Sequence, residues 1–259
     1  MKFIDVHCHI NEKDYGSVDG LIGRINAAGV EKIISAGFDV QSSEYGKSLS
    51  RKYDCVYFTA CVHPTELKTY RVGDLEIIKS LADCQKCVAI GEIGLDYHYP
   101  DTDKILQRKV FLSQLELAIK LEMPVQIHSR DCAEDMFEIL KDYAPSLTAG
   151  AMLHCYSHSV ELASELEKSG LYFSFGGTST WSGSKKAKRV IKALSADRLM
   201  TETDSPYLPP ASKYGAFPNT PESIPEIAEN MAEIKGMSLE SLADCVWNTA
   251  HSFFKKLSN

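Results

Sequence analysis

Residues 3–9 read F-I-D-V-H-C-H, an apolar stretch in which Asp5, His7 and His9 occupy every second position. Alternate side chains of a β-strand point to the same face, so these polar residues share one face while Val6 and Cys8 share the other. The pattern predicts a buried strand that ends in polar groups. Such a strand is either an ordinary part of a core or one part of a metal site, and the remaining sequence distinguishes the two.

Short apolar runs like this one recur along the chain, and segments with helical periodicity separate them. The expected strands are residues 3–9, 32–37, 56–62, 88–93, 125–128, 152–154, 171–175 and 199–203. The expected helices include residues 19–28, 74–82, 133–143, 159–169, 222–235 and 239–256, and one that carries Phe111 and Leu115. Strands that alternate with helices predict a parallel sheet. Eight such units in 259 residues fit an α/β fold, a (β/α)8 TIM barrel, as a single domain over residues 1–259 with an extra C-terminal helix.

Composition and cysteine content set the expected class of protein. The net charge of −7 disfavours a non-specific polyanion binder. No apolar run reaches the roughly 20 residues that span a bilayer, and the N-terminus lacks a signal-peptide pattern, so we expect a cytoplasmic protein with no membrane partner. The eight cysteines are then expected to be reduced. Cys84 and Cys87 have the spacing of half a zinc site, but no second such pair follows, and we interpret them as structural.

Polar residues gather where the expected strands end, which in a TIM barrel is the active-site face. Besides those of the first strand, they are His63, Glu92, His128, Arg130, His154 and Asp204. A lone histidine at a strand end is usually a hydrogen-bonded structural residue. Several strands that all end in His, Glu or Asp would each need separate stabilisation of a buried polar group, whereas one shared metal cluster removes that cost. Imidazoles and carboxylates suit zinc or manganese, and carboxylates also suit magnesium.

The order of these motifs resembles one known family. The runs D-V-H-C-H, H-P, G-E-I-G-L-D-Y, I-H-S-R-D, H-C-Y-S and E-T-D-S-P-Y-L span residues 5 to 208. They are similar to those of the TatD family of metal-dependent deoxyribonucleases, which belongs to the amidohydrolase-like TIM barrels. The combination of G-E-I-G-L-D-Y with E-T-D-S-P is very specific, whereas a single H-x-H would be weak.

The resemblance implies a hydrolase that cleaves DNA, as an exonuclease, with two divalent ions (Mg, Mn or Zn) and a water as nucleophile. The implied ligands of one ion are His7, His9 and Asp204, those of the other are His128 and His154, and Glu92 would bridge the two. Asp204 would also accept the proton of the attacking water. The expected partner is single-stranded or end-frayed DNA, and the sequence indicates no obligate protein partner.

Other polar residues have weaker assignments. His63 and Arg130 are expected to contact the substrate phosphate, although Arg130 could equally pair with Asp131 or another carboxylate. We interpret Asp5 as a carboxylate that orients a ligand imidazole. His158 is expected to be a loop residue that opens a helix.

Two surface features could bind a single strand. Residues 185–189 read K-K-A-K-R and follow Trp181, a combination that suits a phosphate backbone with a stacked base, although we favour a solvated helix face slightly. Tyr97, His98 and Tyr99 could likewise stack on a base or simply pack their loop.

The segment from Lys213 to Pro221 lacks the arginines and the glutamate of the basic loop that members of the family commonly carry there, which leaves two alternatives open. The same metal core could hydrolyse another bond, such as the ester of a D-aminoacyl-tRNA, or a small amide or lactone. A non-catalytic, metal-stabilised scaffold is a third interpretation, which the completeness of the ligand set disfavours.

Overall fold

The computed structural model describes residues 1–257. In this part of the chain, eight parallel strands form one sheet in the order β1 to β8, and each strand pairs with the next one in the sequence. The strands are β1 (Phe3–Cys8), β2 (Val30–Ser35), β3 (Val56–Ala60), β4 (Cys87–Asp96), β5 (Val125–Arg130), β6 (Ala151–Leu153), β7 (Tyr172–Phe175) and β8 (Leu199–Thr201). The sheet curls into a nearly closed barrel, so the predicted (β/α)8 fold is confirmed.

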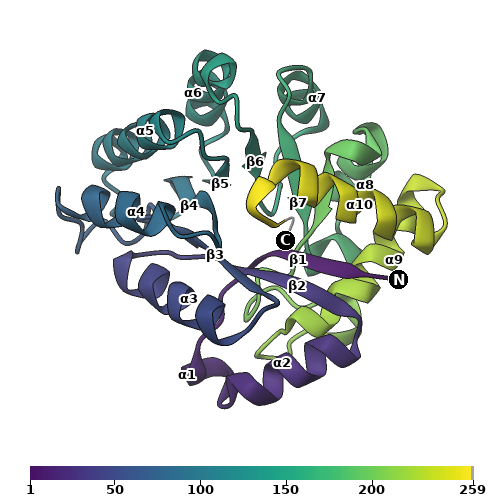
Figure 1. Cartoon of the computed structure of the whole chain (residues 1–259). Coiled ribbons are helices and arrows are strands. Elements are labelled where there is room, and N and C mark those ends of the chain that lie inside the picture. Colours follow the sequence, from purple (N-terminus) through teal and green to yellow (C-terminus); the bar gives the residue numbers. More distant parts are fainter. Residues whose placement is uncertain (258–259) are drawn as a thin grey trace.

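Helices surround the strands on the outside (Figure 1). They are α1 (Glu12–Tyr15), α2 (Val18–Ala27), α3 (Val40–Lys52), α4 (Asp74–Ala82), α5 (Lys104–Lys120), α6 (Ala133–Tyr143), α7 (Val160–Lys168), α8 (Lys185–Ala193), α9 (Ile224–Lys235) and α10 (Leu239–Phe253). The predicted helices are present, including the extra one after the barrel. Among residues 1–257, no helix is both long enough and apolar enough to cross a membrane.

Helix α3 lacks the apolar periodicity that predicts the other helices. Its N-terminus is instead fixed by a capping box, in which the Asp39 carboxylate accepts from the Ser42 N–H and the Ser42 hydroxyl accepts from the Asp39 N–H. It packs through small residues, because a Cβ atom on Gly46 would lie 2.9 Å from Cβ of Phe58 on β3. Close approach between backbones therefore takes the place of a large apolar stripe.

The seam between β8 and β1 is joined by hydrogen bonds outside the regular ladder. The Thr201 hydroxyl donates to the Ile4 carbonyl, and the Asp204 N–H donates to the His7 carbonyl at 3.0 Å. One residue further on, the His9 N–H donates to the Ser205 carbonyl. These bonds hold the end of the first strand against the segment that follows the last.

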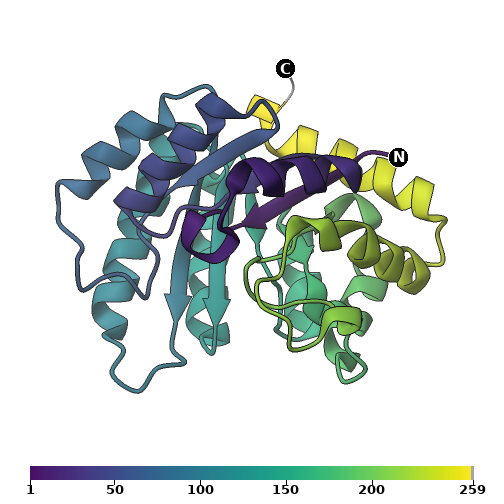
Figure 2. The same ribbon diagram turned by 90° about the horizontal axis from the view of Figure 1, so that it is seen from below.

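The two ends of the barrel differ in what covers them. The C-terminal helix α10 contacts β1 and β8, and the following turn (Lys255–Leu257) contacts β4. At the opposite end lies the irregular segment 205–221 (Figure 2). Pro206 and Tyr207 from this segment line the large pocket of the molecule.

Candidate metal centre

The Glu92 carboxylate on β4 lies at the centre of a ring of imidazoles from other strands. Its Oε1 atom lies 2.6 Å from Nε2 of His154, 2.7 Å from Nδ1 of His128 and 3.2 Å from Nε2 of His63. Its Oε2 atom lies 3.3 Å from Nε2 of His7 and 3.6 Å from Nε2 of His9. The barrel therefore brings all these residues together, although they are far apart in the sequence.

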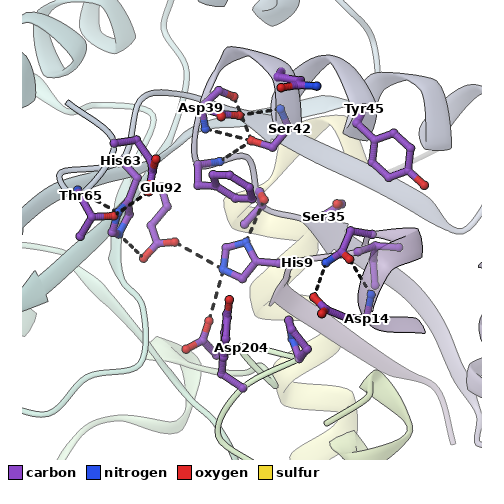
Figure 3. A pocket seen from close by; sticks show the side chains of 18 of the residues that line it. His9, Asp14, Ser35, Asp39, Ser42, Tyr45, His63, Thr65, Glu92 and Asp204 are labelled. Atoms are coloured by element: carbon purple, nitrogen blue, oxygen red, sulfur yellow. Dashed lines mark hydrogen bonds and ion pairs between the residues drawn. The ribbon is translucent and has the colours of Figure 1, made fainter. Parts of the chain in front are cut away.

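The last strand adds a second carboxylate to one side of this ring. Oδ1 of Asp204 lies 3.4 Å from Nε2 of His9 and 3.8 Å from Nε2 of His7. Figure 3 shows His9 between the carboxylates of Glu92 and Asp204, with His63 on the far side of Glu92. One oxygen of Glu92 thus faces the group made by His7, His9 and Asp204, and the other faces the remaining imidazoles.

Each imidazole near Oε2 of Glu92 has its other nitrogen bound to a neutral oxygen. Nδ1 of His7 lies 3.0 Å from Oε1 of Gln126, and the Gln126 amide donates through Nε2 to the Val6 carbonyl. Oε1 of Gln126 is then an acceptor, so Nδ1 of His7 carries the proton. Nδ1 of His9 likewise donates to the Ala36 carbonyl at 3.0 Å. In both rings the lone pair of Nε2 faces the cluster.

Near Oε1 of Glu92, two imidazoles have a buried carboxylate behind them instead. Nε2 of His128 lies 3.0 Å from Oδ2 of Asp96, which leaves Nδ1 to face Glu92. Nδ1 of His154 lies 3.7 Å from Oε1 of Glu202, whose other oxygen accepts from the Ser174 hydroxyl. Asp96 accepts the outer N–H of His128, which fixes the tautomer of that imidazole and makes it a stronger metal ligand. Glu202 lies too far from Nδ1 of His154 for a hydrogen bond but places a negative charge behind that ring.

The donor atoms of this cluster fit a divalent cation. Among the described residues, the fully buried Nε2 of His7 has no hydrogen-bond partner, which is costly unless another group uses its lone pair. Close groups of three potential ligand atoms are formed by His7, His9 and Asp204, and by His63, Glu92 and His128. Nitrogen and carboxylate donors in such groups suit zinc, manganese or similar ions.

Both central carboxylates are held in the ionised form. Burial alone would raise the pKa of Glu92, but the imidazoles of His154, His63 and His7 hold it well below its usual range. Burial also opposes ionisation of Asp204, yet its close contact with His9 and the other neighbouring imidazoles lower its pKa. The cluster therefore presents anionic oxygens at neutral pH, as a cation site requires.

Comparison with known proteins identifies the family of the chain. A model of the TatD related DNase family matches residues 4–255. This chain belongs to that family. The metal-dependent hydrolase YabD of Bacillus subtilis, itself uncharacterized, is 37% identical over 252 residues, which cover 97% of this chain and 98% of YabD. Like its relatives in the TatD family, this protein is a metal-dependent hydrolase.

Two further relatives connect the TatD family with nucleic acids and with solved structures. The 3'-5' ssDNA/RNA exonuclease TatD of Cronobacter sakazakii is 33% identical over 250 residues, which cover 93% of each chain. The crystal structure of the TatD homologue YJJV from Escherichia coli superposes with a TM-score of 0.92 at 28% identity, over 98% of both chains. The TatD fold thus extends over the whole described barrel.

Arg130 and His158, whose roles the sequence assigned less firmly, both lie outside the ring of imidazoles around Glu92. Arg130 is exposed, and its guanidinium lies over the Tyr99 ring, 5.9 Å from the centroid. Asp131 pairs with His98 instead, at 2.9 Å, so the expected alternative of an Arg130–Asp131 pair is not found in the described structure. His158 precedes α7 and contacts the Ser129 hydroxyl at 2.7 Å, away from Glu92, as expected of a loop residue.

The interpretation of Asp5 was wrong. Its carboxylate contacts no imidazole among the described residues; Oδ1 accepts from the backbone N–H groups of His7 and Thr203, and Oδ2 is hydrogen-bonded to the Thr203 hydroxyl. Asp5 therefore ties β1 to the segment after β8. Gln126 occupies the place behind His7, because a side chain on β5, across the barrel, reaches Nδ1 of His7, whereas the Asp5 carboxylate on the same strand does not.

Of the two surface features that could bind a single strand, only one contributes a residue to the pocket. Of the three residues after β4, Tyr99 lines the pocket, whereas Tyr97 donates to the Asp135 carboxylate and packs its loop. The basic run at the start of α8 lies outside the pocket lining. All eight cysteines lie within residues 1–257 and are free thiols, including Cys84 and Cys87.

Sequence reasoning missed residues that act from behind or beside the cluster. Asp96, Glu202 and Gln126 lie behind the imidazoles, and only Asp96 and Glu202 stood in motifs that drew attention. Phe38 lies in the turn between β2 and α3 and lines the pocket, but nothing in its sequence neighbourhood marks it. Phe38 belongs to the site because its ring lies beside that of His9.

Proposed function

We propose that this protein is a two-metal deoxyribonuclease that hydrolyses phosphodiester bonds near the ends of single-stranded or end-frayed DNA. The observation that carries the proposal is the division of Glu92, whose two oxygens face two separate groups of nitrogen donors. A single carboxylate in this position suits a bridge between two ions. The names of the Cronobacter TatD exonuclease and of the deoxyribonuclease Tat-D of Schizosaccharomyces pombe support DNA as the substrate.

In this proposal the ligands divide as the two oxygens of Glu92 do. His7, His9 and Asp204 would hold one ion, His128 and His154 would hold the other, and Glu92 would contribute an oxygen to each. The tautomers support this division, since each of the four imidazoles has its outer nitrogen facing an oxygen of Gln126, Ala36, Asp96 or Glu202. Two ions, whether Mg, Mn or Zn, would polarise the phosphate and lower the pKa of an attacking water.

The protein's own groups then move the proton and hold the substrate. Asp204 is ionised, and its carboxylate can accept the proton of the attacking water. His63 suits a different role from the other imidazoles. Thr65 occupies its Nδ1, with the hydroxyl at 2.8 Å and the N–H at 3.2 Å, so Nε2 is the nitrogen on the cluster side and can donate to a phosphate oxygen when it carries the proton. The exposed guanidinium of Arg130 can bind a second phosphate oxygen.

The test is a metal-reconstituted assay on end-labelled single- and double-stranded DNA, read as product length against time. Wild-type protein should shorten the single strand progressively, whereas Glu92→Ala and Asp204→Asn should lose activity by several orders of magnitude. Glu116→Ala, on the exposed face of α5, is the matched control and should retain full activity. Persistent hydrolysis in both purified, folded site variants would overturn the mechanism.

The acidic lining of the pocket favours one second candidate, hydrolysis of a bond that carries no charge itself, such as the ester of a D-aminoacyl-tRNA. Acidic side chains around the metal cluster outnumber the basic ones, which are Lys13 and Arg130; the acidic ones are Glu12, Asp14, Asp39, Glu44 and Glu66. Parallel turnover of DNA, RNA and misacylated tRNA decides between the two. A much higher kcat/KM on the ester would displace the nuclease proposal. We propose the cytoplasm as the compartment for either activity.

A further inference from the structure

We propose that Phe38 and Tyr207 form a clamp that holds the terminal base of a nucleic-acid strand beside the metal centre. The inference rests on the proposed function, since it concerns how the end of that strand is bound. Both rings line the pocket of about 970 Å³ that opens over the cluster. Both also lie edge-on to His9, with ring centroids 6.0 Å and 6.4 Å away. The two rings therefore lie in the same part of the pocket, on either loop beside His9.

The backbone at both positions is fixed, although the rings are open to solvent. The Phe38 N–H donates to the Ser42 hydroxyl, and its carbonyl accepts from the His63 N–H. The Tyr207 N–H donates to the Asp204 carbonyl, and its own carbonyl accepts from the buried side chain of Asn219. Yet the side chains remain 39% and 56% exposed. Folding thus holds two aromatic surfaces in place without using them in the core, so that a planar ligand loses little entropy by binding between them.

Charge favours an uncharged base in this part of the pocket. In Figure 3, Asp14 and His63 lie on opposite sides of His9. The phosphate is expected on the His63 side, where Nε2–H can donate to it, whereas a second phosphate beside the Asp14 carboxylate would be repelled. A base and its sugar carry no charge, and an aromatic ring stacks on any base without reading its identity. The clamp therefore suits the terminal nucleoside of a strand of any sequence.

A further aromatic side chain continues the surface away from the metal centre. The Phe217 ring lies 6.3 Å from that of Tyr207 and is 61% exposed. It belongs to the segment 213–221, in which Lys213 is the one basic side chain. Because this segment offers few cations for phosphate groups, stacking of a base on the rings would supply binding energy that phosphate contacts would otherwise provide. Because a base must leave its pair to enter the clamp, the arrangement predicts a preference for unpaired ends.

The direct test uses a single strand protected by phosphorothioate linkages, with 2-aminopurine at its 3′ end or, in a second strand, at its 5′ end. Stacking quenches the fluorescence of this base. Wild-type enzyme with metal should quench one of the two strands. Phe38→Leu and Tyr207→Leu should each raise Kd about tenfold and lose the quenching. The matched variants Phe38→Tyr and Tyr207→Phe keep a ring and should behave as wild type; quenching by the leucine variants equal to wild type would overturn the clamp.

A second measurement depends on wild-type enzyme alone and separates the clamp from the proposed function. Two otherwise identical strands end in a normal nucleotide or in an abasic residue. The clamp predicts about tenfold higher kcat/KM for the normal end. Equal hydrolysis of both strands would overturn the clamp while the nuclease function stands. Hydrolysis of neither strand would overturn the nuclease function, and the fluorescence measurement would still decide whether a base is bound.

Discussion

The backbone N–H of Asp204 donates to the carbonyl of His7 at 3.0 Å, so that the first and last strands of the barrel meet at two proposed ligands of one ion. Asp204 adopts a positive φ of 51°, which an L-residue rarely occupies. Such a conformation costs about 1–3 kcal/mol and persists only where the surrounding structure holds it. Here the bonds across the seam hold it, and the Asp204 carboxylate is directed at His9 as a result.

Metal binding should therefore stabilise the whole barrel, because the ion would link the first strand to the segment after the last strand. We expect an increase of about 2.7 kcal/mol in the free energy of unfolding when the free metal is 100 times its Kd, because the ion binds only the folded site. Thermal unfolding with manganese or zinc, against a chelator-treated sample, measures the shift. Glu92→Ala should abolish it, and Glu116→Ala should not. An equal shift in Glu92→Ala would place the binding elsewhere.

Removing the carboxylate behind His128 should weaken metal binding. Asp96→Ala leaves the outer nitrogen of that imidazole without an acceptor, and we expect about 10- to 100-fold lower metal affinity in a competition titration with a chelator. Asp96→Asn keeps an acceptor oxygen and should lose less. Asp101→Ala, on the exposed surface nearby, is the control. Unchanged affinity in Asp96→Ala would show that the tautomer of His128 is fixed in another way.

The second glycine of the G-E-I-G motif is required by close contact between two strands. Gly94 has a φ of 150°, and a Cβ atom there would lie 2.0 Å from the carbonyl oxygen of His128. Gly94→Ala should destabilise the protein by at least about 1–3 kcal/mol and displace His128, which lowers metal affinity as well.

Gly23→Ala is the matched control for this substitution. Gly23 lies in helix α2, and a Cβ atom there meets nothing within 4 Å. Alanine at this position should stabilise the helix by up to about 1 kcal/mol. Chemical unfolding of both variants gives the comparison. A Gly94→Ala protein as stable as wild type would contradict the contact.

Asp5 should make stability depend on pH. Burial raises the pKa of its carboxyl from 3.8 to about 8, so the folded protein keeps a proton that the unfolded chain releases above about pH 4. The contribution of this group to stability is complete below that pH, falls by up to about 1.4 kcal/mol per pH unit as the pH rises, and levels off above about pH 8.

Asp5→Asn isolates this effect, because the amide imitates the protonated carboxyl. In metal-free protein, the difference in unfolding free energy between Asp5→Asn and wild type should grow from pH 5 to pH 8 in favour of the variant. Asp101→Asn, at an exposed position, should show no such trend. A constant difference across this pH range would mean that Asp5 is ionised in the folded state.

The alternation of apolar strands with periodic helices was sufficient to predict the barrel, because both signals are local. Strand ends such as His128 and Asp204 were also predictable as neighbours, since all strands of a parallel barrel end at one face. Helix α3 was harder to predict because small residues, Gly46 among them, pack where apolar ones usually do. The length and order of the segments thus determined the architecture without any tertiary information.

The surroundings of the metal cluster depended on the tertiary structure. Gln126 reaches His7 from the opposite barrel wall, and Asp5 binds the segment after β8, because curvature of the sheet decides which side chains meet across the interior. Phe38 and Tyr207 converge on His9 from loops about 170 residues apart in the chain. The sequence by itself determined which chemical groups the site contains. Only the folded barrel decided which nitrogen faces the cluster and which rings stand beside it, since these depend on distances between strands that no local pattern encodes.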